Sequence, residues 1–98
     1  MTAGSTATAF DLDLAWRLHP QVSVRPERFG ALLYHFGTRR LSFLKSTKLL
    51  AVVRSLEHEG SARSACAAAG VTPAELPSYA AALGALAASS MICVGVAS

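Results

Sequence analysis

Several residue types are scarce in this chain of 98 residues, and each scarcity excludes a class of protein. Two cysteines, Cys66 and Cys93, are too few for a disulfide framework, and isolated thiols fit a reducing, cytoplasmic compartment. The opening sequence MTAGSTATAF lacks the basic region and the long apolar core of a secretory signal. The three histidines lie in different predicted elements without the spacing of zinc ligands, so we expect neither a metal site nor a bound cofactor.

Acidic residues are also few, and their distribution divides the chain by charge. Between Arg17 and Arg54 there are eight basic residues and a single acid, Glu27, which gives this segment a charge of +7. The flanking regions hold one basic residue and five acids, a net charge of −4. The carboxylates are scattered, with no serine, histidine and acid arrangement and no phosphate-binding glycine loop. We therefore expect a protein that is not an enzyme and whose positive half attracts an acidic partner.

Charged residues are absent after Glu75, which raises the question of a membrane segment. The run from Tyr79 to Ala97 is long enough to span a bilayer. However, alanine dominates it, two serines interrupt it, and Pro77 and Gly84 lie in or beside it. A buried helix followed by a short terminal strand is the favoured interpretation, and we expect no membrane association.

What is present is a hydrophobic content of 52%, enough for one core in a chain of this length. We expect residues 1–13 to form a flexible N-terminal arm and residues 14–98 a single domain. Trp16, Leu18 and Val22 are expected to form a short extra strand or a cover over one end of the core.

Three strands are predicted, over residues 22–25, 30–36 and 40–45. Gly37-Thr38 suits a two-residue turn with glycine first, and this turn pairs Leu32 with Phe43 and Tyr34 with Leu41. One face of the hairpin then carries Leu32, Tyr34, Phe36, Leu41 and Phe43. The other face carries Leu33, His35, Arg40, Ser42 and Leu44. We expect the first, aromatic face to pack on the helices.

Three helices are predicted after the strands. Ser46 or Thr47 begins the first, and Ser61 begins the second, which covers residues 62–69. The sequence Thr72-Pro73-Ala74-Glu75 is a capping box that opens a third helix to about residue 89, with its main part beginning near Pro77. The fold class is therefore α+β, a winged helix-turn-helix-like domain in which a three-stranded antiparallel sheet is followed by three helices.

A winged-helix outline and a basic charge suggest a nucleic-acid-binding protein as an alternative. Direct readout of bases needs Arg, Lys, Asn or Gln on the recognition helix. From Thr72 to Ser90 the chain has none of these residues. We therefore expect no sequence-specific nucleic-acid recognition by this helix, while weak non-specific binding stays open.

The third predicted strand, Arg40 to Lys45, is the most informative segment. It runs almost directly into helical sequence, so its outer side is predicted to stay unpaired, and such an edge can accept another extended chain. Three other interpretations stay open. The basic turn could be a solvated tip, the basic residues could only prevent aggregation, or the edge could pair with a second copy in a homodimer.

The stretch from Trp16 to Lys45 also resembles a known family. The similarity is densest in Arg25-Pro26-Glu27, in residues 29–39 and in residues 41–45, and it continues through residues 50–53 and 68–71. The chain resembles the peptide chaperones of mycofactocin biosynthesis. These belong to the precursor-peptide recognition elements of ribosomally made peptides, typified by the chaperone of pyrroloquinoline quinone biosynthesis.

The resemblance implies a function and a site. The implied function is non-catalytic: the protein holds the leader of a precursor peptide and presents the peptide to a radical S-adenosylmethionine maturase. In the family, the leader adds as a strand beside the third strand, and its side chains enter the groove between that strand and the third helix. The expected peptide-binding residues are Arg39, Arg40, Leu41, Ser42, Phe43, Leu44, Lys45, Lys48, Tyr79, Leu83 and Leu86. We expect the Ser42 amide to donate at the edge and the basic side chains to attract acidic leader residues.

Overall fold

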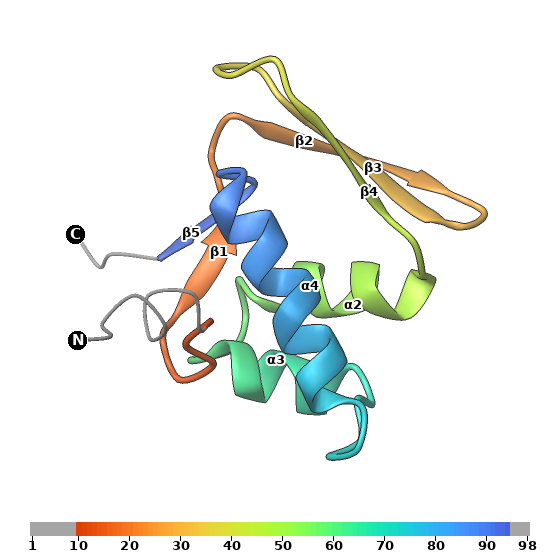
Figure 1. Ribbon diagram of the computed structural model, residues 1–98, viewed down its shortest axis with the longest axis vertical. Helices are drawn as coiled ribbons and strands as arrows, with labels where there is room; N and C mark the ends of the chain where they lie inside the picture. The colour runs from red at the N-terminus through yellow and green to blue at the C-terminus, as the bar shows by residue number, and fades with distance from the viewer. Residues whose placement is uncertain (1–9, 95–98) are drawn as a thin grey trace, which may run out of the picture.

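The computed structural model describes residues 10–94, which form a three-stranded sheet, a separate two-stranded sheet and three helices (Figure 1). The elements follow in the order β1 (Trp16–Leu18), β2 (Val22–Glu27), β3 (Gly30–His35), β4 (Leu41–Leu44), α2 (Thr47–Ser55), α3 (Ala62–Ala68), α4 (Leu76–Ala88) and β5 (Ile92–Val94). The sheet β2–β3–β4 is antiparallel and lies across one side of the three helices (Figure 1). The predicted α+β class, with three antiparallel strands followed by three helices, is confirmed.

A second, two-stranded sheet joins the two ends of the described chain. β1 pairs with β5 antiparallel, with Trp16 opposite Val94 and Leu18 opposite Ile92. Of the two alternatives expected near Trp16, an extra strand or a cover over the core, the strand forms, and the predicted short terminal strand forms as well. The pairing closes the domain next to α4, which β5 follows directly (Figure 1).

The helices α2 and α3 begin at the serine caps that the sequence predicts. The Ser46 hydroxyl accepts a hydrogen bond from the amide of Leu49 at 2.9 Å, and Ser61 does the same for Ser64 at 3.1 Å. The capping box also forms: the Glu75 amide donates to the Thr72 hydroxyl at 3.3 Å and the Thr72 amide to the Glu75 carboxylate at 3.0 Å. It makes a separate turn, after which α4 begins at Leu76.

The hairpin has the predicted register but a wider turn. Leu32 lies opposite Phe43 and Tyr34 opposite Leu41, as expected. The turn, however, is closed by a hydrogen bond from the Arg39 amide to the His35 carbonyl at 2.7 Å, and Arg39 is in the left-handed region with φ of 64°. The prediction of a two-residue turn with glycine first is therefore wrong, although the strand alignment it implied is right.

The prediction of which hairpin face packs on the helices is wrong. Leu33 and Leu44 are completely buried, whereas Phe36, Leu41 and Phe43 expose 59%, 55% and 59% of their surfaces. The aromatic face therefore points away from the helices. The buried core consists of Ala31, Leu33, Leu44, Leu50, Val52, Val53, Leu56, Ala62, Ala65, Cys66, Leu83, Leu86, Met91 and Ile92.

His35 explains why this face can be buried despite its polar residues. Its imidazole is 3% exposed, and Nδ1 accepts hydrogen bonds from the amides of Gly37 and Thr38 at 3.0 and 3.1 Å. The ring also packs on His19, with the centroids 4.4 Å apart. The two hydrogen bonds at Nδ1 satisfy the backbone of the turn and offset part of the cost of burying this side chain, whereas Nε2 is buried without a hydrogen-bond partner among the described residues.

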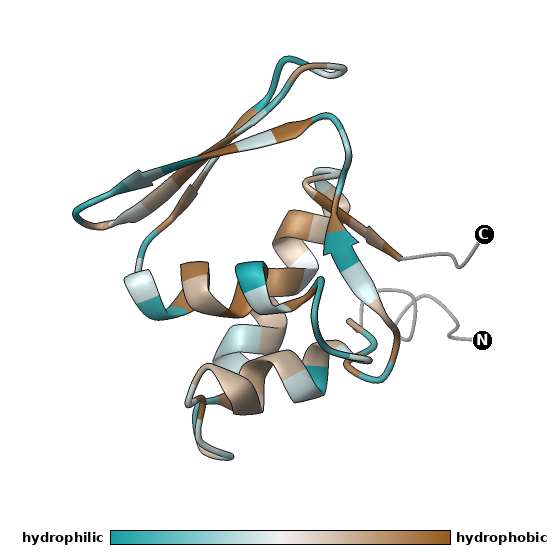
Figure 2. Cartoon of the chain, turned by 180° about the vertical axis from the view of Figure 1, so that it is seen from behind, coloured by the Kyte–Doolittle hydropathy of each residue, from teal (hydrophilic) through white to brown (hydrophobic). Residues whose placement is uncertain are grey.

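The terminal segments bear on two further predictions. Residues 1–9 of the predicted N-terminal arm lie outside the described residues, but Phe10 stacks on Trp16 with centroids 4.6 Å apart, and Asp13 pairs with Arg63 at 2.9 Å. None of the helices in residues 10–94 combines the length and the hydrophobicity needed to cross a bilayer, and α4 has only 13 residues. In Figure 2, α3 and α4 are mostly pale because alanine dominates them, whereas α2 alternates strongly coloured segments.

Gly30 is the position where the backbone leaves no room for a side chain. Its φ is +151°, and a Cβ there would lie 2.1 Å from the Leu44 carbonyl oxygen and 2.8 Å from that of Ser46.

We expect Gly30→Ala to destabilise the fold by about 3 kcal/mol or more. Gly60→Ala is the matched control, since its Cβ meets nothing within 4 Å, and should change stability by less than about 1 kcal/mol. Chemical denaturation of both variants measures this, and equal stabilities would contradict it.

Candidate functional site

The outer edge of β4 is open, because β4 has no other partner than β3 within residues 10–94. The hydrogen bond from the His35 amide to the Arg40 carbonyl, 2.9 Å long, fixes which residues bond across the hairpin. In this alternation Ser42 and Leu44 direct their backbone groups toward β3, whereas Leu41 and Phe43 direct theirs outward. The expectation that the Ser42 amide is an edge donor is therefore wrong, and the outward amides are those of Leu41 and Phe43.

A groove runs between this open edge and α4. Its larger part has a volume of about 530 Å³, and a smaller hollow of about 140 Å³ continues it toward the beginning of α4. The larger part is lined by Leu41, Ser42, Phe43, Leu44, Lys45, Leu49, Ala82, Ala85 and Leu86. The smaller hollow is lined by Lys45, Ser46, Leu49, Ser78, Tyr79 and Ala82. The groove thus places an apolar, mostly aliphatic surface directly beside unpaired backbone groups.

Most of the residues predicted for the site come together here, but not all. Leu41 to Lys45, Tyr79 and Leu86 line the groove, whereas Leu83 is completely buried in the core and does not line it. Arg39 and Arg40 are exposed at the turn, beyond the lining residues. Sequence reasoning missed Leu49, Ala82 and Ala85. The alanines recur at helical spacing with Ser78, but an alanine-rich helix gives little contrast between its faces.

Lys48, the fourth basic residue predicted for the site, forms a salt bridge within the domain. Its ammonium donates to the Glu75 carboxylate at 2.8 Å, which links the beginning of α2 to the beginning of α4. This hydrogen bond raises the pKa of Lys48 above its ordinary value and, together with the Thr72 amide, lowers that of Glu75. Lys48 is therefore less available to an acidic ligand than Lys45, which is exposed on the groove itself.

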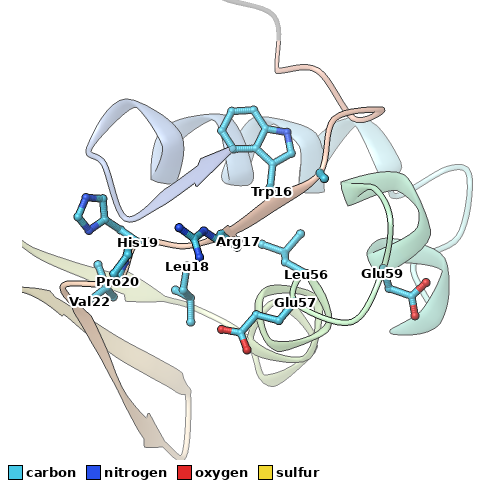
Figure 3. Close-up of a pocket in the computed structure, with 10 residues that line it drawn as sticks. Trp16, Arg17, Leu18, His19, Pro20, Val22, Leu56, Glu57 and Glu59 are labelled. Atoms are coloured by element: carbon cyan, nitrogen blue, oxygen red, sulfur yellow. The ribbon is translucent and has the colours of Figure 1, made fainter. Parts of the chain in front are cut away.

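A separate cavity of about 570 Å³ lies on another part of the domain (Figure 3). Side chains of β1, including Trp16 and Leu18, line one side, and Leu56, Glu57 and Glu59 from the end of α2 and the following turn line the other. It shares no lining residue with the groove. Unlike the groove, it does not adjoin the open edge of β4.

Comparison with known proteins gives consistent matches. A model of the peptide chaperone MftB family matches residues 15–93. Peptide chaperone MftB of Mycobacterium ulcerans is 61% identical over 90 residues, which are 92% of this chain and 83% of that protein. Peptide chaperone MftB of Mycobacterium tuberculosis is 57% identical over 86 residues, which are 88% of this chain and 79% of that protein. The comparison with solved structures finds no significant match.

These matches define the class of the protein as a peptide chaperone, a non-catalytic class that implies a peptide partner. Within that class, the chain belongs to the MftB family. The resemblance to the chaperones of mycofactocin biosynthesis is thereby confirmed, as is the prediction that the protein is not an enzyme.

The Lys48–Glu75 pair predicts how stability responds to pH. The folded-state pKa of Glu75 is lowered, so its contribution is complete above the ordinary value of 4.5 and is lost as the pH falls through the folded value. The raised pKa of Lys48 acts oppositely: its contribution is present below 10.5 and is lost as the pH rises through the folded value.

We therefore expect Glu75→Gln to lower Tm by a few degrees at neutral pH, and this difference to shrink in acid below pH 4.5. Thermal unfolding followed by circular dichroism across this range measures the effect. Glu57→Gln is the control, because Glu57 forms no salt bridge within residues 10–94. A Tm difference that stays constant down to strong acid would contradict the assignment.

Proposed function

We propose that this chaperone binds the leader of a ribosomally made precursor peptide by strand addition at β4 and presents the peptide to a radical S-adenosylmethionine maturase in mycofactocin biosynthesis. The observation that carries the proposal is the open β4 edge directly beside an apolar groove. Strand addition takes affinity from main-chain hydrogen bonds and specificity from pockets for alternate side chains.

The alternation along β4 determines what an added strand meets. Side chains of the added strand that lie opposite Ser42 and Leu44 enter the groove toward α4, because paired residues of adjacent strands share a face. Side chains opposite Leu41 and Phe43 lie on the exposed outer face of the sheet. The bound leader is therefore expected to place apolar residues at every second position, on the side of Ala82 and Ala85.

Magnitudes show that the edge alone is insufficient. The amides and carbonyls of Leu41 and Phe43 offer four hydrogen bonds, worth about 2–6 kcal/mol together. Ordering a free peptide and losing its translational freedom cost about as much or more. Micromolar affinity requires about −8 kcal/mol net, so burial of apolar leader side chains in the groove must supply most of the binding energy.

Charge supports the choice of partner. Arg39, Arg40 and Lys45 are exposed around the open edge, which favours association with an acidic leader. The free thiols of Cys66 and Cys93 fit a cytoplasmic location. Nucleic-acid recognition is not favoured, because α4 carries no Arg, Lys, Asn or Gln and the basic residues lie mainly in the sheet and its turns.

Filling the groove tests the contribution of α4. Ala85 is exposed and lines the groove, so Ala85→Phe should occupy it without disturbing the core and weaken leader binding by about tenfold or more. Ala81→Phe is the matched control, because Ala81 is also exposed on α4 but does not line the groove. Calorimetric titration with a synthetic leader measures both. Absence of saturable binding to the unmodified protein at micromolar concentrations would sink the proposal.

Removing one outward amide tests strand addition itself. Phe43→Pro eliminates a donor that the β3 ladder does not use, and Phe43→Ala removes the same side chain while keeping the donor. We expect the proline variant to bind the leader about fivefold or more weakly than the alanine variant, with both remaining folded. Unfolding midpoints are measured alongside the titrations. Equal affinities of the two folded variants would exclude this edge as the site of pairing.

A further inference from the structure

The outer face of the sheet is an exposed apolar surface that packs on nothing within residues 10–94. Phe29, Phe36, Leu41 and Phe43 are each about half exposed or more, with values from 47% to 59%. Phe29 contacts Phe43 with ring centroids 6.3 Å apart, and Tyr34 meets Phe36 edge-on at 5.1 Å. These residues, together with Leu32, form one continuous surface over β3 and β4, here called the outer aromatic face. A contiguous apolar surface of this kind marks an interaction site.

The border of the outer aromatic face is positively charged. From Val22 to Lys45 the chain has five basic residues and one acid, a net charge of +4. The acid, Glu27, is already paired with Arg25 at 3.0 Å, and Arg25 lies on the outer face opposite Leu32. A second copy of the chain would bring two such positive borders together, which opposes self-association through this face. An apolar patch bordered by carboxylates is the complementary surface.

The arrangement of the rings favours a protein over a nucleic acid. Base stacking needs flat, accessible ring faces. Here Tyr34 and Phe36 meet at 85°, and the aliphatic side chains of Leu32 and Leu41 share the face with the two aromatic pairs, so the surface is uneven. Such a surface matches the apolar centre of a protein interface, in which aromatic residues are enriched and the border is polar.

We propose that the outer aromatic face is the docking surface for the enzyme that modifies the bound peptide, through an apolar patch of that enzyme bordered by acidic residues. This inference rests on the proposed function. The face includes Leu41 and Phe43, whose backbone groups point toward the added strand, so alternate leader side chains extend the same surface. The enzyme therefore contacts the chaperone and its peptide together, which places the peptide against the enzyme without release.

Two substitutions on this face avoid the peptide edge. Phe36 lies beyond the end of β3, and Arg25 lies on β2, the strand farthest from the open edge of β4. Phe36→Ser removes an exposed anchor, and Arg25→Glu reverses a border charge. Arg54→Glu on α2 makes the same charge change at an exposed position away from the sheet, and serves as the control.

The experiment measures binding of the purified radical S-adenosylmethionine maturase of the mycofactocin pathway to each variant under anaerobic conditions, and separately binding of the synthetic leader. We expect Phe36→Ser and Arg25→Glu each to weaken maturase binding by about tenfold, with leader affinity unchanged. Both variants should stay folded, and Arg25→Glu should lower Tm only slightly, because the pair with Glu27 that it breaks is largely exposed. Arg54→Glu should bind the maturase like the unmodified protein. The effect of Arg25→Glu should decrease as salt is added.

The failure of this inference differs from the failure of the proposed function. If Phe36→Ser and Arg25→Glu both keep the maturase affinity and the leader affinity of the unmodified protein, the docking surface is wrong, but strand addition at β4 is not contradicted. Absence of leader binding to the unmodified protein overturns both. A homodimer in sedimentation that Phe36→Ser dissociates, or oligonucleotide binding that Phe36→Ser abolishes, would assign the face to another occupant and overturn the inference.

Discussion

One-sided packing of the hairpin is the constraint on which the remaining structure depends. Leu33 and Leu44 are completely buried against the helical layer, and Gly30 allows the chain after β4 to pass close to β3. Because strand residues alternate between faces, this one choice also determines which backbone groups β4 directs outward and which side chains stay exposed. The open edge and the exposed aromatic surface are therefore two results of the same packing.

α4 serves two surfaces at once, and its composition reflects both. Leu83 is completely buried and anchors the helix in the core, while Ala82 and Ala85 face the groove. Larger side chains at Ala82 and Ala85 would fill the groove. The alanine content that makes this helix look featureless in the sequence is thus what keeps a hollow beside β4.

The sequence predicted local features well and long-range ones less well. The caps at Ser46 and Ser61 and the strand register depend on neighbouring residues, so pattern was sufficient to find them. The buried face depends on how side chains fill space against helices far along the chain, and on His35 accepting hydrogen bonds from a turn. In the candidate site, Leu41 to Lys45 line the groove as expected. Leu83 lies in the core instead, and the sequence did not reveal this because an alanine-rich helix gives little contrast between its faces.

The two alanines of α4 that line the groove determine how easily the shape of the groove can change. Since Ala82 and Ala85 contribute little to the core, exchange for larger side chains changes the depth of the groove while the anchors of α4 keep their positions. Groove depth is therefore a property that single substitutions can adjust almost independently of stability. Under the proposed function, two positions on one helix set how deeply a leader side chain enters the groove, while the rest of the fold stays the same.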